Sequence, residues 1–365
     1  MNTILAIRKE QLPDNIKELK NFIIIGEGVL KAHRLQLNTI KKIGTTQNYY
    51  NAKLYDGQRV AEIVLEAQGK LGEVLGETVK KDGIKIKGGS SQSTALPSLP
   101  HTITKKESHI AQSIARNPEI VIEVIERAKD NREIPTTREV LEEIQIQAKE
   151  EKKQQIINSY LQKAEDYKPD DSIQILEGDF REVTKQFEDN SIDHIMTDPP
   201  YKKEFISLWS DLSKIAERIL KPGGFCVVYA GQCFLPEEIK RLGEHLEYYW
   251  IVALLHTYRL MVEMRNIGNY YRTVLVFRKT PAQKHRYITD VVPPTPKEKD
   301  LHPWQQSEGE MDELLEKFTH PGDLILDPFA GSGTTLASCL KNKRRCIGIE
   351  LEKENCQIIK GRLTK

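Results

Sequence analysis

Residues 192–201 read IDHIMTDPPY, an apolar run that stops at Asp198 and continues directly into two prolines and a tyrosine. Proline has no backbone N–H to donate to a sheet, so the strand predicted at His194–Thr197 must end before Pro199. In an open parallel sheet, ligands bind outside the carboxyl ends of the strands. The D-P-P-Y tetrapeptide is therefore predicted to face a ligand site.

On both sides of this strand, from Ile173 to the C-terminus, short apolar runs alternate with amphipathic segments. This alternation predicts an α/β domain at residues 170–365, with a mostly parallel, seven-stranded sheet and helices on both faces. The strands are predicted at Ile173–Leu176, His194–Thr197, Phe225–Tyr229, Trp250–Leu255, Val274–Phe277, Leu324–Leu326 and Cys346–Ile349. The helices are predicted at about residues 204–220, 236–247, 309–318, 334–342 and 352–363.

The first 165 residues are predicted to form an all-helical part of the chain. Apolar residues recur every three or four positions from about 46 to 87, so residues 1–87 form a first helical region. The stretch GGSSQSTALPSLP at 88–100 has the Gly, Ser and Pro content of a linker. Residues 101–165 suggest a bundle of three helices, with Asn117-Pro118 between the first two and a capping box, Thr136-x-x-Glu139, opening the third.

Two functions are compatible with the bundle at 101–165. Three short helices with tight turns can form a helix-turn-helix reader of DNA. Acidic residues interleave throughout, which instead favours a docking or dimerisation module and is compatible with a homodimer. The basic residues that could contact phosphates are Lys105, Lys106, Arg116, Lys129, Arg132 and Arg138.

The composition excludes several classes of protein. No apolar run approaches the ~20 residues of a membrane helix, and the N-terminus lacks a basic leader and a cleavage site, so a cytoplasmic location is expected. The five cysteines form no C-x-x-C pair, so no metal site is predicted. A net charge of +1 provides no overall basic field, so nucleic-acid binding would depend on local patches.

The D-P-P-Y segment has the chemistry to hold a flipped base. The Asp198 carboxylate and the Pro199 carbonyl could accept both hydrogens of an exocyclic amine, and Pro200 and Tyr201 complete the segment. Stacking on Tyr201 would contribute ~1–3 kcal/mol, which offsets much of the few kcal/mol that extruding a nucleotide costs. Taken alone, the tetrapeptide is equally compatible with an ordinary turn after a strand.

A second segment, DLILDPFAGSGTT at 323–335, supplies the missing context. A strand ends at Asp327, and a turn containing Gly331 and Gly333 opens a helix at Thr334. Glycines there let the backbone approach a ligand closely. Glu350 ends the next strand roughly 20 residues after Gly331, the distance expected for an acid that binds ribose hydroxyls. The turn is neither a Walker loop nor a complete dinucleotide fingerprint, so it suits an adenosyl ligand without a pyrophosphate.

Together, the two segments resemble the DNA adenine-N6/cytosine-N4 methyltransferases in their permuted, β-type order, in which D-P-P-Y precedes the F-x-G-x-G cofactor loop, here Phe329–Gly333. The resemblance covers about residues 170–365. It implies a Rossmann-like methyltransferase fold, S-adenosylmethionine as the cofactor and double-stranded DNA as the substrate. It also implies catalytic roles for Asp198, Pro199, Pro200 and Tyr201.

The resemblance also assigns cofactor contacts residue by residue. Contacts to the methionine part are implied for the loop residues Asp327, Phe329, Gly331 and Gly333, with Thr334 beside them. Glu350 would bind the ribose, and Asp179, in ILEGDF, would approach the adenine of the cofactor. The family often carries an H-P-x-Q-K-P element before the loop; residues 302–307 read HPWQQS, without the lysine and the final proline. His302 and Gln305 remain expected cofactor neighbours, although a structural histidine would look the same.

Aspartate at position 198, where serine is the family's marker for cytosine, favours methylation of adenine at N6. The alternatives are a cytosine-N4 DNA methyltransferase, an RNA methyltransferase, and a methyltransferase-like DNA-binding protein that has lost activity. Between the two halves, only Thr257–Arg272 and Thr280–Asp300 are left over from the predicted core. Target recognition is therefore expected either from a short site there or from the N-terminal helices.

Overall fold

The computed structural model describes residues 11–44, 46–81, 100, 102–262, 266–281, 284–294 and 307–364. The chain divides into two compact units, Met1–Glu151 and Lys152–Lys365. The linker predicted at 88–100 lies outside the described residues except for Pro100. None of the helices among the described residues combines the length and apolar content that crossing a bilayer requires.

The N-terminal unit is built from helices whose ends follow ordinary capping rules. The side chain of Asn15 accepts the N–H of Glu18 at 2.9 Å at the start of the first helix, and Gly44, with φ of +72°, ends that helix. The capping box predicted at Thr136 is confirmed, because the Glu139 N–H donates to the Thr136 hydroxyl and the Thr136 N–H donates to the Glu139 carboxylate. The helices are α2 (Ile16–Ile43), α3 (Gln47–Lys81), α4 (Lys105–Arg116), α5 (Pro118–Asp130) and α6 (Thr137–Lys163).

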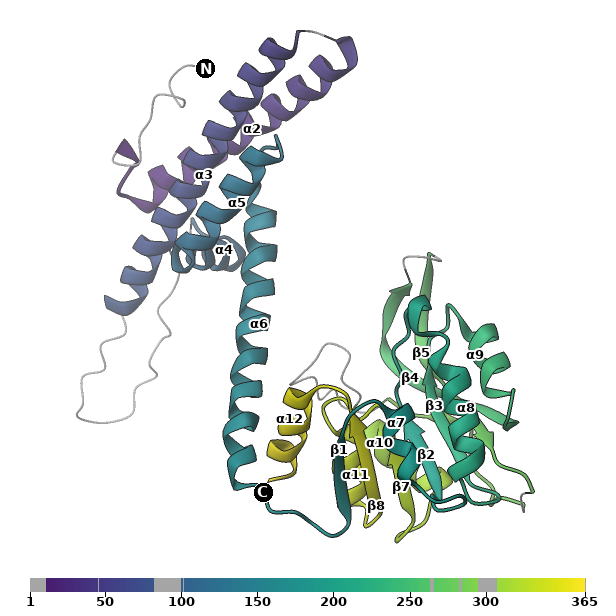
Figure 1. Ribbon diagram of the computed structural model, residues 1–365. Helices are drawn as coiled ribbons and strands as arrows, with labels where there is room; N and C mark the ends of the chain where they lie inside the picture. Colours follow the sequence, from purple (N-terminus) through teal and green to yellow (C-terminus); the bar gives the residue numbers. More distant parts are fainter. Residues whose placement is uncertain are drawn as a thin grey trace, which may run out of the picture. The chain divides into compact units, whose positions relative to one another are not determined.

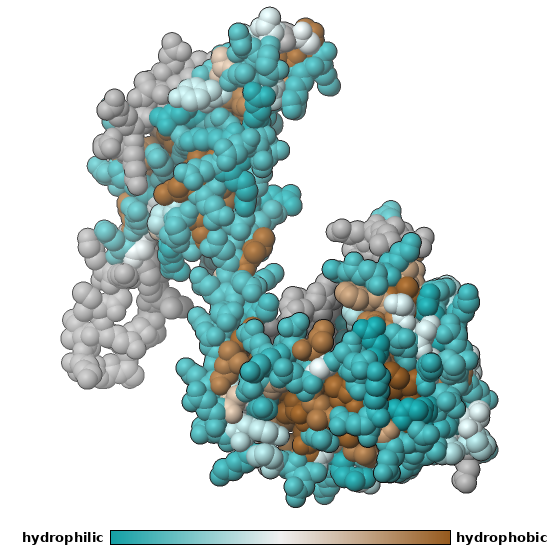
Figure 2. Space-filling model, viewed as in Figure 1, coloured by the Kyte–Doolittle hydropathy of each residue, from teal (hydrophilic) through white to brown (hydrophobic). Residues whose placement is uncertain are grey.

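The helical part does not separate into the two regions that its sequence suggests, 1–87 and 101–165. One buried cluster contains Leu71 of α3 together with Ala111 of α4, and a second contains Leu65 of α3 together with Ile114 of α4. The two helices approach closely at Gly72, where a Cβ would lie 2.0 Å from the Ala111 carbonyl oxygen. Figure 2 shows a mostly hydrophilic surface over these helices.

An eight-stranded sheet organises the C-terminal unit (Figure 1), in the order β1-β8-β7-β2-β3-β5-β4-β6. The first five of these strands run parallel, β5 is antiparallel to both of its neighbours, and β6 is parallel to β4. The expected α/β fold with a mostly parallel sheet is confirmed, with β6 as an additional short strand. The strands are β1 (Ile173–Glu177), β2 (His194–Thr197), β3 (Phe225–Ala230), β4 (Glu247–Val262), β5 (Ile267–Arg278), β6 (Val291–Val292), β7 (Leu324–Asp327) and β8 (Arg345–Glu350).

Helices cover both faces of this sheet, as the near-continuous apolar strands require. Alternate residues of β3 divide between two buried clusters: Val227 and Tyr229 pack on one face, and Cys226 and Val228 on the other. The first face is covered by α10 (Glu308–Phe318), α11 (Thr334–Lys341) and α12 (Lys353–Leu363). The second face is covered by α7 (Phe180–Val183), α8 (Leu208–Ile219) and α9 (Leu235–Leu242).

The segment Thr257–Arg272, expected to lie outside the core strands, belongs largely to a long hairpin. Strand β4 continues to Val262 and β5 begins at Ile267, so both strands extend well beyond the predicted Trp250–Leu255 and Val274–Phe277. The longer strands were not predicted because this segment contains many charged and aromatic residues and lacks the apolar pattern of a core strand.

Gly361 in α12 provides a test of how the end of α6 packs on the sheet domain. A Cβ at this position would lie 1.8 Å from the carbonyl oxygen of Tyr160, so the two backbones must separate to admit an alanine. We expect Gly361→Ala to lower the free energy of unfolding by about 1–3 kcal/mol, measured by thermal denaturation. The matched change Gly28→Ala, at an exposed position of α2 with open space around it, should raise stability by about 0.5–1 kcal/mol. Equal effects at the two positions would contradict the close packing of Gly361.

Candidate functional site

The two sequence motifs meet at the carboxyl edge of the sheet. Strands β2 and β7 lie side by side, with Ile195 paired to Leu326, so Thr197 and Asp327 end up as neighbours. The Thr197 hydroxyl donates to Oδ1 of Asp327 at 2.6 Å, a contact between residues 130 positions apart. The structure therefore brings the D-P-P-Y segment and the glycine loop together, as the strand-end argument predicted.

Asp327 is a buried acid at the centre of this junction, with 3% of its surface exposed. The burial raises the pKa of its carboxyl group to about 6, although hydrogen bonds from Thr197, Thr335 and the Phe329 N–H act in the opposite direction. The carboxylate of Asp198 adds to the increase in pKa. Asp327 thus acts as the polar anchor of the turn that follows it, and its protonation is coupled to the acid of the D-P-P-Y segment.

The glycine turn has the backbone geometry that its sequence required. Gly331 and Gly333 have φ of +52° and +83°, a region that other residues rarely adopt, and Gly333 is the N-cap of α11. The Gly331 N–H donates to Oε2 of Glu350 at 2.8 Å. The other Glu350 oxygen accepts the Glu352 N–H at 3.0 Å and the Asn355 side-chain amide at 3.2 Å. Among the described residues these contacts use three of the roughly four acceptor positions of a carboxylate, which leaves one for a ligand hydroxyl.

A cavity of about 510 Å³ opens beside this turn, at the carboxyl ends of β1 and β8. Phe180 and Phe329 form part of its wall, with ring centroids 4.8 Å apart, and Glu350 contributes a carboxylate. Hydrophobic residues also gather on the visible face of this unit in Figure 2. The chemistry of the lining fits an adenosyl group, because the aromatic walls can contact a purine while Glu350 accepts from a ribose. Its complete lining is Gly178, Asp179, Phe180, Arg181, Pro200, Glu204, Phe205, Ser207, Leu208, Pro328, Phe329, Gly331, Ile349, Glu350 and Leu351.

Asp179 lies in the lining of this cavity, but its carboxylate already has a strong partner. The Arg181 guanidinium donates to both oxygens of Asp179, and this hydrogen bonding holds the pKa of the carboxyl below its ordinary value despite partial burial. A contact from Asp179 to the cofactor's adenine would share the carboxylate with Arg181.

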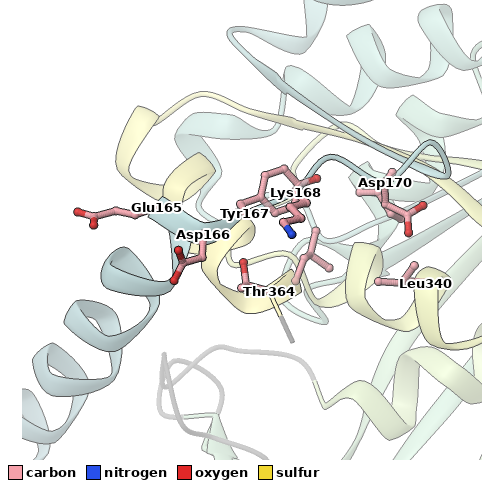
Figure 3. A pocket seen from close by; sticks show the side chains of 9 residues that line it. Glu165, Asp166, Tyr167, Lys168, Asp170, Leu340 and Thr364 are labelled. Atoms are coloured by element: carbon pink, nitrogen blue, oxygen red, sulfur yellow. The ribbon is translucent and has the colours of Figure 1, made fainter.

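A larger cavity, of about 750 Å³, lies beside the amino end of β1, and Figure 3 shows the side chains that line it. It adjoins Ile173 at the amino end of β1 and Leu340 near the end of α11, and acidic residues such as Glu165, Asp166 and Asp170 line it. None of the predicted site residues that the structure describes borders it. Because ligands of open α/β sheets bind at the carboxyl ends of the strands, the smaller cavity is the candidate site.

The D-P-P-Y segment itself is compact. The Tyr201 phenol donates to Oδ1 of Asp198. Burial raises the pKa of the Tyr201 hydroxyl well above its ordinary value, and the neighbouring Asp198 raises it further, so the phenol remains a neutral donor. Pro199 is buried, whereas Pro200 lies at the cavity wall. Two of the four catalytic candidates, Asp198 and Tyr201, are thus hydrogen-bonded to each other.

The sequence reasoning missed several polar residues that surround these motifs. Tyr229 at the end of β3 and Glu310 in α10 are buried, and both interact electrostatically with Arg272. Arg362 in α12 holds the glycine turn, because its Nη1 donates to the Ser332 carbonyl at 3.1 Å and to the Thr334 hydroxyl at 3.1 Å. Tyr229 could have been noted as a polar residue at the carboxyl end of a predicted strand, whereas no sequence signal marks Arg362 or Glu310.

Arg362 also contacts Thr334, which was expected to contact the cofactor. Its side chain is buried and accepts a hydrogen bond from Arg362, so its hydroxyl stabilises the turn. His302 and Gln305, the other expected cofactor neighbours, lie outside the described residues. In the described part of the chain, no three His, Cys, Asp or Glu side chains converge to form a metal site.

Several of the basic residues proposed to contact DNA phosphates are engaged within the helical unit. Lys129 forms an ion pair with Glu62, Arg138 forms one with Glu142 at 2.7 Å, and Arg116 donates to the Gln112 side chain. The two ion pairs reduce the positive charge that the bundle offers to a polyanion.

Comparison with known proteins matches both motif segments to methyltransferase families. The model of a DNA methylase family matches residues 283–361, which contain the glycine loop, and that of an RMKL-like methyltransferase domain matches residues 104–243, which contain D-P-P-Y. Both matches and the two motifs support a DNA methyltransferase of the N6/N4 type.

Relatives of this DNA methyltransferase match about half of the chain. The type II methyltransferase M.HpaI of Haemophilus parainfluenzae is 25% identical over 220 residues, which are 49% of this chain and 70% of the relative. The putative methylase YubD of Escherichia coli K12 is 27% identical over 190 residues, 48% of this chain and 83% of the relative.

Solved structures resemble the same half of the methyltransferase. The complex of M1.HpyAVI with SAM has a TM-score of 0.45 and 27% identity, covering 53% of this chain and all of that one. The cytosine-N4-specific PvuII methyltransferase has a TM-score of 0.47 and 20% identity, covering 55% of this chain and 90% of that one. S-adenosylmethionine is the cofactor of this family, and the 510 Å³ cavity has the lining to hold its adenosyl part.

The buried Asp327 gives the methyltransferase a testable pH dependence. Its folded-state pKa of about 6 exceeds the ~3.9 of an unfolded aspartate, so the unfolded chain releases this proton first as the pH rises. Stability from this group is therefore complete below about pH 4 and falls by about 3 kcal/mol as the pH passes 6. We expect Asp327→Asn, which cannot ionise, to lack this decrease. Urea denaturation of both proteins from about pH 4 to 7 measures the difference, and parallel pH profiles would contradict the assignment.

Proposed function

We propose that this methyltransferase transfers the methyl group of S-adenosylmethionine to the exocyclic N6 amine of adenine, at a defined sequence in double-stranded DNA. The observation that carries the proposal is the position of Asp198. Its carboxylate lies at the carboxyl end of β2, beside the Thr197–Asp327 hydrogen bond that connects it to the glycine loop. An acceptor for the amine and the loop for the methyl donor thus occupy adjacent strand ends.

Asp198 and the Pro199 carbonyl would orient the target nitrogen. Two acceptors that take both amine hydrogens direct the nitrogen lone pair away from the ring, and in-line transfer then mainly requires that the reacting atoms be held about 3–3.5 Å apart. Positive charge grows on the nitrogen as the nitrogen–methyl bond forms and the methyl–sulfur bond breaks, and the Asp198 carboxylate stabilises that charge until one amine proton leaves. No covalent intermediate on the protein is required.

Tyr201 would change partners when a base enters. Its phenol now occupies one oxygen of Asp198, which the amine needs. Release of this hydrogen bond would free the carboxylate and leave the tyrosine ring available for stacking on the flipped base. The exchange replaces one donor to Asp198 by another, so the carboxylate is satisfied both before and after binding.

The choice of adenine rests on aspartate at position 198 and not on the comparisons, which point in both directions. The DNA adenine methyltransferase YhdJ of Escherichia coli is 35% identical over 91 residues, whereas the similar PvuII structure is cytosine-N4-specific. The β4–β5 hairpin is our candidate for sequence recognition, because Tyr270 and Tyr271 of β5 are exposed close to the catalytic edge.

The proposal is tested by incubating the purified protein with duplex DNA and isotope-labelled S-adenosylmethionine, then digesting the DNA and identifying the nucleosides by mass spectrometry. We expect labelled N6-methyladenine. Labelled N4-methylcytosine would retain the enzyme and overturn the choice of base. Label in RNA but not in DNA would overturn the choice of nucleic acid.

Asp198→Ala removes the amine acceptor. We expect it to abolish labelling while leaving cofactor affinity within about two-fold, because the adenosyl cavity does not include this residue. Labelling at the wild-type rate would remove Asp198 from the mechanism. Asp189→Ala, at an exposed acid that pairs with Arg218 away from the cavity, is the matched control and should label normally.

Variants of Tyr201 separate stacking from hydrogen bonding. We expect Tyr201→Phe, which keeps the ring, to retain most activity, and Tyr201→Ala to lose about 10- to 100-fold in kcat/KM, the equivalent of ~1–3 kcal/mol of stacking. Comparable losses in both variants would show that the hydroxyl, rather than the ring, carries the role of this residue.

A further inference from the structure

Arg272 lies at the catalytic edge because its strand, β5, is antiparallel to both of its neighbours. In the register of β3 with β5, Ala230 pairs with Thr273, so Arg272 lies just beyond the carboxyl end of β3. Its side chain is 23% exposed, which places a permanent positive charge in a mostly enclosed position. Because β5 is antiparallel to β3, Arg272 directly precedes the segment Thr273–Arg278 that pairs with β3.

The guanidinium of Arg272 has N–H donors that are available for a ligand. Its Nη1 lies 3.7 Å from Oε2 of Glu310, too far for a hydrogen bond, and its Cζ lies 5.9 Å from the centre of the Tyr229 ring. A guanidinium has five N–H donors in a planar fork that matches a carboxylate. Within the described residues, no hydrogen bond to a protein acceptor uses them.

The Tyr229 hydroxyl is a second unsatisfied group at the same place. Tyr229 is 1% exposed, and its hydroxyl has no hydrogen-bond partner among the described residues. Buried hydroxyls are almost always hydrogen-bonded, so one without a partner points to a missing ligand. Glu310, Arg272, Asp198 and Asp327 all lie within electrostatic range of it.

The balance of charge around these groups suits an amino acid. Among the described residues, the carboxylates of Asp198, Glu310 and Asp327 and the guanidinium of Arg272 all act electrostatically on the Tyr229 hydroxyl. An α-amino acid presents an ammonium and a carboxylate on the same carbon, so it needs acidic and basic partners side by side. The Glu310–Arg272 pair provides both. The remaining acids, Asp198 and Asp327, would favour a cofactor whose sulfonium gives it a net positive charge.

We propose that the Arg272 guanidinium, together with the Tyr229 hydroxyl, binds the carboxylate of the methionine end of S-adenosylmethionine, with Glu310 facing the ammonium. This role would fall to Arg272 because residue 306 is Gln where the family's H-P-x-Q-K-P element has lysine. The inference rests on the cofactor of the family and not on the base that is methylated. A failure here therefore leaves the choice of adenine untouched.

The experiment compares two ligands by isothermal titration calorimetry on the full-length protein without DNA. S-adenosylmethionine carries the carboxylate, and decarboxylated S-adenosylmethionine keeps the sulfonium and the amine but lacks the carboxylate. We expect Arg272→Met to weaken the first about 10- to 100-fold and the second less than about three-fold, as a lost charge-assisted contact to the carboxylate requires. The protein-by-ligand comparison isolates that contact from general effects of the substitution.

Three further variants complete the design. Tyr229→Phe removes one unpaired oxygen without changing the packing, so it should fold normally and weaken only S-adenosylmethionine, by about three- to ten-fold. Arg272→Lys should give a smaller loss than Arg272→Met, because it keeps the charge without the fork. Arg278→Met is the control: this arginine lies at the other end of β5, paired with Glu247, and its loss should change neither affinity.

Selective loss of S-adenosylmethionine affinity in Arg272→Met and Tyr229→Phe supports the proposal. Equal losses for the two ligands would overturn it and leave Arg272 with a structural role. Unchanged cofactor affinity with weaker binding to a DNA duplex would also overturn it, and would assign the guanidinium to a phosphate. Nucleoside analysis of the wild type separately tests the choice of base.

Discussion

The hydrogen bond from Thr197 to Asp327 is the contact on which the rest of the site depends. It joins the ends of β2 and β7 and so fixes the D-P-P-Y segment relative to the glycine loop. The same Asp327 oxygen accepts the Phe329 N–H, which starts the turn toward Gly331. Glu350 then holds the other side of that turn through the Gly331 N–H. The buried carboxylates of Asp327 and Glu350 thus position the backbone of the loop through hydrogen bonds, at the carboxyl ends of the strands.

This construction explains why the site is acidic although the protein as a whole is nearly neutral. Buried carboxylates are costly unless they accept several hydrogen bonds, and backbone N–H groups in tight turns supply those bonds. The same acids create a potential that favours a cationic ligand. Fixing the loop and attracting the sulfonium are therefore two results of one arrangement of charges.

Most of the fold could be predicted because buried parallel strands appear in sequence as continuous apolar runs. The strand at His194–Thr197 and the ends at Asp327 and Glu350 are examples, and both motifs lie at the predicted strand ends. The extended β4–β5 hairpin escaped prediction because its outer part is charged and aromatic. The cluster of Tyr229, Arg272 and Glu310 escaped for a different reason: its members come from β3, β5 and α10, and only the sheet register brings them together.

The single antiparallel strand also has a consequence for how the protein can diverge. Because β5 enters the sheet at the catalytic edge, the end of β4 and the start of β5 pair with each other beyond the last residues of β3. Insertions or deletions at the tip of the hairpin leave the pairing of Val274–Phe277 with β3 unchanged, so the core keeps its register while the projecting part varies. The surface beside the reaction centre can therefore change in evolution while the stability of the sheet stays the same.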